Sequence, residues 1–139
     1  MMPDAANDGW HAIGSHSVRF EEPDILHIRV VGDLANDQVR GLLNTFEESI
    51  RNVPRPVAMV DISKSGRPNL DILKSSDLLD QMRRYRAFVY YNAQFSHRTV
   101  LDIVRKISRA FRLSLQYTPL IAFATEAEAY AWIEQFRKQ

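Results

Sequence analysis

An aspartate and a serine follow an apolar run in the stretch VAMVDISKSGRP, residues 57–68, and a histidine comes later in the chain. If the apolar run is a strand, Asp61 and Ser63 lie at its carboxyl end, where open α/β sheets usually bind their ligands. His97 follows the next predicted strand and is expected to emerge at the same edge. A carboxylate, a hydroxyl and an imidazole at one edge are the groups of a Ser–His–Asp hydrolase, so this is the first chemistry to consider.

The sequence around the serine favours a structural role over catalysis. One common hydrolase motif, G-x-S-x-G, holds its serine on a strained turn, and the chain has no such motif. Short polar side chains after a strand often bond the backbone amides of the turn and of the next helix. We therefore expect Asp61 and Ser63 to bond backbone amides, and we keep a hydrolase that includes His97 as a minor alternative.

Motif and composition argue against several other reaction centres. Gly66 stands alone, and neither of the glycine-rich phosphate motifs, G-x-x-x-x-G-K-[ST] and G-x-G-x-x-G, occurs. The absence of cysteine excludes disulfides, thiolate catalysis and zinc–thiolate sites. No two histidines have the spacing of a metal site. The four histidines are His11, His16, His27 and His97. We expect no metal and no cofactor, and we expect His27, which alternates with Leu26 and Ile28, to face solvent or a partner.

Composition is typical of one globular domain. The 139 residues are 45% apolar and 25% charged, and the formal net charge of +1 gives no overall attraction to nucleic acid or to an anionic membrane. The first eight residues are polar and lack the basic start and apolar core of a signal peptide. We expect residues 1–8 to be a disordered tail and residues 9–139 to form one domain. Apolar runs far shorter than the ~20 residues of a membrane span predict a soluble, cytoplasmic protein.

The hydrophobic pattern predicts an α/β fold. Val18, Phe20, Ile28 and Val30 alternate with polar residues, so we expect an antiparallel hairpin that turns at residues 22–24. Further along, apolar strands and amphipathic helices alternate. The predicted strands are 17–22, 25–31, 57–62, 87–91 and 119–124, and the predicted helices begin near residues 36, 68, 96 and 125. The order ββαβαβαβα implies about four helices packed on a mixed sheet of about five strands, with the hairpin at one edge.

The predicted helices have an apolar face that should pack on the sheet. The expected buried residues are Val39, Leu42, Leu43, Phe46 and Ile50 in the first helix, Ile72, Leu79 and Met82 in the second, and Ala129, Trp132, Ile133 and Phe136 in the last. Thr125 and Glu128 have the spacing of a capping box, which predicts where the last helix begins. Aromatic residues of the sheet and the last helix could line a pocket, but most such residues fill a core.

The helix predicted from about Ser96 to Leu115 carries arginines on one face and apolar residues on the other. The arginines are Arg98, Arg105, Arg109 and Arg112, with Asp102 among them. Such a row of guanidinium groups could meet an anionic partner, namely an acidic protein surface or a phospholipid head group. Nucleic acid is disfavoured, because the row has little aromatic interleaving and the overall charge is near neutral. The alternative is an ordinary solvated helix face.

Three segments together resemble a known family. The hairpin PDILHIRVVGDLANDQ, the strand VAMVDIS and the ending FATEAEAYAWI are similar in order and spacing to the SpoIIAA-like branch of the STAS superfamily, which is named for sulfate transporters and anti-sigma factor antagonists. The resemblance covers about residues 10–136. It implies a small α/β fold with helices packed on a mixed sheet.

The resemblance also implies where a regulatory serine would stand. In the antagonists, a serine at the start of the helix after the central strand accepts phosphate from a kinase, and Asp61 matches the aspartate of that strand. The corresponding turn here falls near residues 68–71, which contain no serine. Ser63 and Ser65 come too early, while the serines at 75 and 76 are expected inside the helix. The phosphorylation switch is therefore not carried over to this chain, although the free amides at the helix start could still receive an anion.

Two functions remain open. The first is a non-enzymatic regulatory or protein-interaction module of the STAS type, whose partner is another protein or a second copy in a homodimer. The second is a domain that binds a small apolar or anionic ligand, or a lipid in a pocket like that of Sec14 proteins. The candidate binding residues are Asp61, Ser63, Ser65, Asn69, Arg98, Arg105, Arg109 and Arg112.

Overall fold

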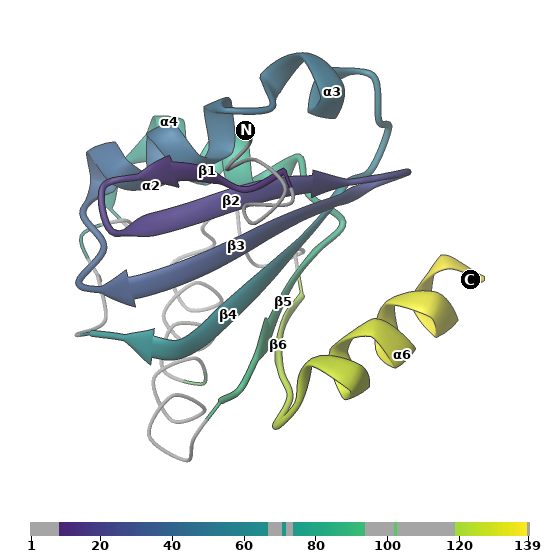
Figure 1. Ribbon diagram of the computed structural model, residues 1–139. Helices are drawn as coiled ribbons and strands as arrows, with labels where there is room; N and C mark the ends of the chain where they lie inside the picture. The colour runs from purple at the N-terminus through teal and green to yellow at the C-terminus, as the bar shows by residue number, and fades with distance from the viewer. Residues whose placement is uncertain (1–8, 67–70, 72–73, 94–101, 103–118, 139) are drawn as a thin grey trace, which may run out of the picture.

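A six-stranded mixed sheet forms the centre of the computed structural model, which describes residues 9–66, 71, 74–93, 102 and 119–138. In the sheet the strands follow their chain order, from β1 at one edge to β6 at the other (Figure 1). The first three strands pair antiparallel, and β3, β4, β5 and β6 pair parallel. The strands are β1 (His11–Ile13), β2 (His16–Glu21), β3 (Ile25–Gly32), β4 (Val57–Ser65), β5 (Ala87–Tyr91) and β6 (Leu120–Ala122).

Helices cover both faces of the sheet in the described part of the chain. They are α2 (Asn36–Asn44), α3 (Glu47–Arg51), α4 (Ser76–Arg83) and α6 (Glu126–Arg137). Figure 1 shows α2, α3 and α4 on one side of the sheet and α6 on the other. The predicted capping box is confirmed, because the Thr125 hydroxyl accepts from the Glu128 amide at 3.2 Å and the Glu128 carboxylate accepts from the Thr125 amide at 3.1 Å.

Two apolar layers form the core, one on each face of the sheet. The layer under α2, α3 and α4 includes Leu42, Leu43, Ile50 and Leu79, as the helical pattern predicted. The layer under α6 contains alternate residues of β4 and β5 packed against Ala129 and Ile133. Because β4 is buried on both faces, its nearly continuous apolar sequence is explained by its central position.

The predicted α/β fold and the hairpin are confirmed, but three details of the prediction were wrong. The sheet has six strands because residues 11–13 add a short edge strand, β1, which is too short to show an alternating pattern. The first helix is divided into α2 and α3 near Phe46, which leaves the helical conformation. The central strand extends through Asp61 to Ser65, three residues beyond its predicted end, because residues 64 and 65 still pair with the end of β3.

Some predictions concern residues that lie outside the described part of the chain. These include the start of the second helix near Pro68 and Asn69, the histidine at 97, and the arginines at 98, 105, 109 and 112. Between residues 94 and 118 the structure describes Asp102, which is helical and exposed. Among the helices that are described, none has the length and apolar character needed to cross a bilayer.

Candidate functional site

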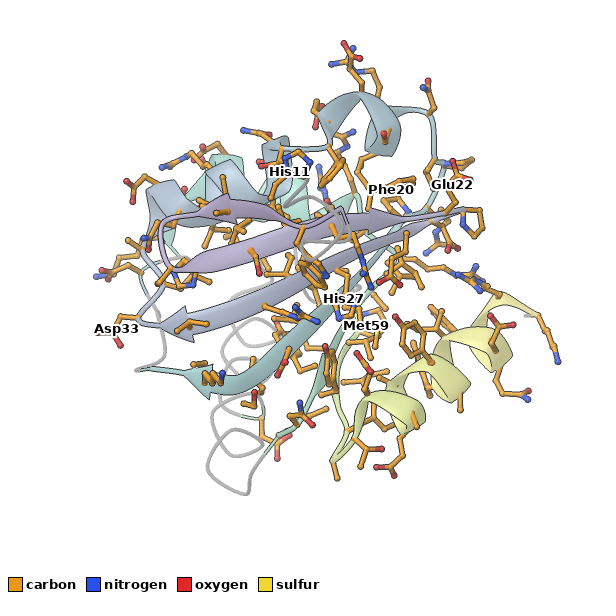
Figure 2. All side chains as sticks on the ribbon, viewed as in Figure 1. His11, Phe20, Glu22, His27, Asp33 and Met59 are labelled. Atoms are coloured by element: carbon orange, nitrogen blue, oxygen red, sulfur yellow. The ribbon has the colours of Figure 1, made fainter. Side chains whose placement is uncertain are left out.

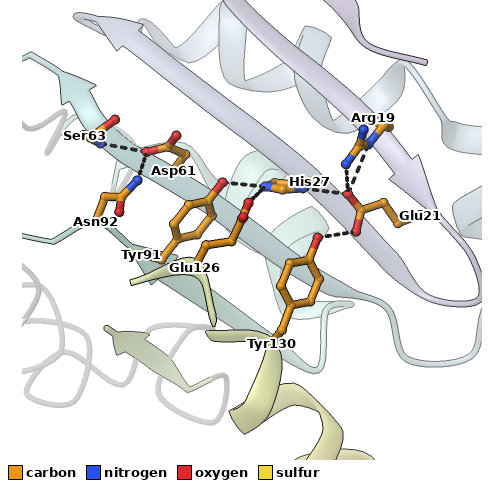
Figure 3. A network of polar contacts seen from close by, with 9 residues as sticks. All are labelled: Arg19, Glu21, His27, Asp61, Ser63, Tyr91, Asn92, Glu126 and Tyr130. Atoms are coloured by element: carbon orange, nitrogen blue, oxygen red, sulfur yellow. Dashed lines mark hydrogen bonds and ion pairs between the residues drawn. The ribbon is translucent and has the colours of Figure 1, made fainter. Parts of the chain in front are cut away.

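The carboxylate of Asp61 is fixed on the sheet face by two hydrogen bonds. Its Oδ1 atom accepts from the Ser63 backbone amide at 2.9 Å and from the Asn92 side-chain amide at 3.1 Å (Figure 3). The bond to the Ser63 amide is the backbone bond that the sequence predicted for Asp61. Asn92 follows β5 with φ 59, a conformation that asparagine tolerates better than most residues. The Asn92 bond joins β4 to the end of the neighbouring strand β5, and the Ser63 bond holds the carboxylate against its own strand, so Asp61 has a structural task.

The same contacts keep Asp61 ionised. Burial by itself would raise the pKa of this carboxyl group, but the hydrogen bonds from Ser63 and Asn92 and the positive charge of Arg29 outweigh it and hold the pKa below its ordinary value. A carboxylate with a lowered pKa and an occupied oxygen is a weak general base. The Ser63 side chain is exposed beside it.

The other serines near this edge make local bonds. The Ser65 hydroxyl donates to the Ile62 carbonyl at 2.9 Å, and the Gly66 amide next to it donates to the Gly32 carbonyl at 2.8 Å. The serines at 75 and 76 were expected inside a helix; Ser76 is the first residue of α4, but Ser75 precedes the helix as its N-cap. Serine is favoured at helix starts, and the hydroxyl of Ser75 donates to Asp77 at 2.6 Å.

A second polar cluster lies under α6, around His27. The expectation that His27 faces solvent or a partner was wrong, because its side chain is 1% exposed. Figure 2 shows His27 and Met59 on the side of the sheet that faces α6. Both ring nitrogens have partners: Nδ1 lies 2.7 Å from a Glu21 carboxylate oxygen, and Nε2 lies 2.6 Å from the Tyr91 hydroxyl (Figure 3). The alternating pattern correctly puts His27 on the face opposite Leu26 and Ile28, but this second face of β3 is covered as well, so the imidazole finds its partners inside.

Glu21 is the centre of this cluster, which we call the Glu21 network and define as Arg19, Glu21, His27, Tyr91 and Tyr130. The carboxylate accepts from Nε of Arg19 at 3.1 Å and from the Tyr130 hydroxyl at 2.7 Å, in addition to His27. Burial by itself would raise its pKa, but the bonds from His27, Tyr130 and Arg19 prevail and lower the pKa of Glu21 to about 2. Because Glu21 is ionised, it must accept, so Nδ1 of His27 carries the proton.

The two tyrosines of the network stay protonated. Burial, strengthened by nearby carboxylates, raises the pKa of the Tyr91 and Tyr130 hydroxyls well above the ordinary value. In the neutral tautomer of His27 that carries its proton on Nδ1, Nε2 accepts the hydrogen of the Tyr91 hydroxyl. Glu126, in the first turn of α6, lies 3.8 Å from the same nitrogen. The network therefore joins β2, β3, β5 and α6, and its bonds position α6 on the sheet.

This network could not be predicted from the sequence, because its members are far apart in the chain. Tyr130 and Glu21 are 109 residues apart, and Tyr91 and His27 are 64 residues apart. One signal was available. A histidine between two apolar residues, in a strand that a parallel sheet buries on both faces, requires a buried polar partner.

A metal site finds no support in the described residues, where no three histidine or acidic side chains gather as ligands. The aromatic residues that could have lined a pocket include Phe88, which is buried against Tyr85 in the core. The polar groups around Asp61 and His27 are thus bonded to one another in ways that fix strand ends and α6.

A double substitution, Asp61→Asn with Ser63→Ala, tests whether these residues are structural. We expect the free energy of unfolding to fall by about 1 to 2 kcal/mol, because the bonds at Asp61 weaken and an ionised acceptor is lost. Denaturant unfolding measures this loss. Screens with ester and phosphate-ester substrates should give the same result for both proteins. Turnover that the wild type has and Ser63→Ala abolishes would restore the hydrolase interpretation.

Comparison with known proteins identifies the fold. No protein-family model matches the chain, and no curated protein matches it either. Among solved structures, it is similar to the crystal structure of an uncharacterised protein of the DUF3478 family from Shewanella loihica PV-4, which is described as having a SpoIIAA-like fold. The TM-score is 0.56 at 16% sequence identity, over 88% of this chain and 98% of the other. Together with the six-stranded mixed sheet and its helices, this likeness shows that the chain is an α/β domain with the SpoIIAA-like fold that its sequence pattern predicts.

Proposed function

We propose that the chain is a non-enzymatic interaction module that binds a protein partner at the carboxyl ends of β3 and β4. The observation that carries the proposal is the fixed carboxylate of Asp61, which is bonded on one oxygen and stands beside exposed side chains. We call this surface the strand-end surface and define it by five residues: Arg29, Val31, Asp61, Ser63 and Lys64.

The chemistry of the strand-end surface fits binding better than catalysis. A serine nucleophile needs a base within hydrogen-bond reach. Beside Ser63, Asp61 has a lowered pKa and is engaged by Asn92. The His27 imidazole, on the same side of the sheet, is buried and has both nitrogens occupied. The described groups therefore supply a rigid pattern of charge and polarity without an activated nucleophile.

The composition of the strand-end surface suits a protein partner. Val31 is 38% exposed, and among the described residues it is the one large hydrophobic side chain that is exposed. Arg29 and Asp61 are cross-strand neighbours of opposite charge, and Ser63 and Lys64 are exposed. An exposed apolar side chain within a polar and charged rim is the usual arrangement of a protein–protein contact.

Affinity capture from the host of this protein tests the proposal with matched variants. Ser63→Arg places a long charged side chain on the strand-end surface. Gln135→Arg makes the same change on the exposed side of α6. We expect the wild type and Gln135→Arg to retain a protein that Ser63→Arg loses, with all three equally folded by circular dichroism. Equal capture by all three would contradict the strand-end surface. Native mass spectrometry that finds a bound small molecule and no protein would favour the ligand-binding alternative.

A further inference from the structure

The sheet face under α6 is covered by that helix over only part of its width. The residues that α6 covers are Ile25, Val57, Met59, Ala87, Val89 and Tyr91. Beyond them, Ser17, Arg29 and Asp61 occupy one cross-strand row on β2, β3 and β4, and cross-strand neighbours point to the same face. Arg29 in this row is exposed. The face around this row is therefore polar and lies beyond the apolar residues that α6 covers, and we call it the polar floor.

An indole from the N-terminal segment lies on this floor. The guanidinium carbon of Arg29 is 3.9 Å from the centre of the Trp10 ring, and that of Arg19 is 4.6 Å away. The His27 ring meets the indole edge to face, with ring centres 4.9 Å apart. A guanidinium group set against the face of a tryptophan ring is attracted by the electron density of that ring, and the attraction works equally for a ring that approaches a fixed cation. Arg19, His27 and Arg29 thus form a receptor for an aromatic ring, and Trp10 is its occupant.

The attachment of Trp10 allows another aromatic ring to replace its indole. Trp10 stands one residue before β1, and it is half-buried. The ring contacts that place it come from Arg19, Arg29 and His27. The residue before it, Gly9, has a backbone φ of +84, a conformation that residues other than glycine adopt only at an energetic cost. The position of the indole therefore depends on a glycine turn and on three ring contacts.

We propose that Arg19, His27 and Arg29 form a recognition site for an aromatic side chain of a partner protein, and that Trp10 occupies this site until the partner displaces it. The inference deepens the proposed function and rests on it, because Arg29 belongs both to this site and to the strand-end surface. Displacement makes binding competitive, so anything that releases Trp10 should increase the affinity of the site for an aromatic ring. Removal of a cation from the floor should decrease that affinity.

NMR titration with N-acetyl-tryptophanamide tests the site without knowledge of the partner. Cross-peaks of the Arg29 side chain and of the Trp10 indole report the occupancy, and Trp132→Phe assigns the two indole signals. We expect Trp10→Ala to bind the probe at least about tenfold more tightly than the wild type. Adding Arg29→Gln to Trp10→Ala should weaken this binding about fivefold, the equivalent of about 1 kcal/mol. N-acetyl-leucinamide should not bind.

Two glycine variants test whether tighter probe binding follows from the release of Trp10 or from backbone strain in general. Gly9→Ala strains the turn that places Trp10 and removes no ring contact, so it should strengthen probe binding about fivefold. Gly32→Ala imposes similar strain at φ +77 at the far end of β3, where an added methyl meets nothing within 4 Å, and should leave probe binding unchanged. If neither Trp10→Ala nor Gly9→Ala binds more tightly than the wild type, the site is refuted. That result would leave the strand-end surface standing, because affinity capture tests it separately.

Discussion

Glu21→Gln is expected to lower the free energy of unfolding by about 2 kcal/mol at pH 7, and the difference from the wild type should vanish as the pH falls towards 2. The substitution removes the ionised acceptor that His27, Tyr130 and Arg19 share. The pKa of Glu21 is about 2 in the folded chain and 4.5 without these contacts. Its contribution is therefore complete above pH 4.5 and is lost as the pH falls from about 4.5 to about 2. The expected size is discounted for partial solvent screening of the carboxylate.

Urea unfolding of both proteins at a series of pH values measures this effect. The matched control is Glu22→Gln, which changes the neighbouring and exposed glutamate in the same way. The control should follow the wild-type curve throughout. A difference for Glu21→Gln that stays constant between pH 6 and pH 2 would show that the carboxylate charge does not hold the network together.

Gly66→Ala should destabilise the chain by about 2 to 3 kcal/mol, since a side chain at this position overpacks the join between β3 and β4. A methyl group on Gly66 would lie 2.1 Å from Oδ1 of Asp33 and 2.8 Å from its backbone nitrogen. The Asp33 side chain can rotate away, but the backbone cannot move without loosening the bond between the Gly66 amide and the Gly32 carbonyl. Because the same change distorts the strand-end surface, the Gly66→Ala variant should also fail to capture the partner protein.

Thermal unfolding and affinity capture together check this prediction. Lys64→Ala is the control for stability, because Lys64 is an exposed neighbour two residues away on the same strand end. Its melting temperature should stay within about 2 °C of the wild type, because exposed substitutions change stability little. An equally small change for Gly66→Ala would mean that the two strand ends tolerate separation and do not form a rigid surface.

Elements with strong local signals could be predicted from the sequence. The strand 87–91 has the predicted bounds, and the capping box at Thr125 determines the start of α6. Both signals depend on residues within a few positions of each other. The short strand β1 could not be predicted, because three residues carry no detectable alternation and the strand forms by pairing with β2.

The candidate site was predicted only where its bonds are local. The bond from the Ser63 amide to Asp61 spans two residues and follows from known turn chemistry. The Asn92 bond to the same oxygen spans 31 residues and depends on the pairing of β4 with β5. His27 was wrongly expected to be exposed for a similar reason. Its partners, Glu21 and Tyr91, come together only when the sheet is assembled and α6 covers it.

Photo-crosslinking at residue 63 shows directly whether the strand-end surface binds a protein. A benzophenone amino acid replaces Ser63 in one protein and Gln135 in another, and both are irradiated in cells of the host. Both positions are exposed, and they lie on β4 and on α6. We expect a discrete covalent adduct with a protein from position 63 and none from position 135. No adduct from position 63, or the same adducts from both positions, would contradict it.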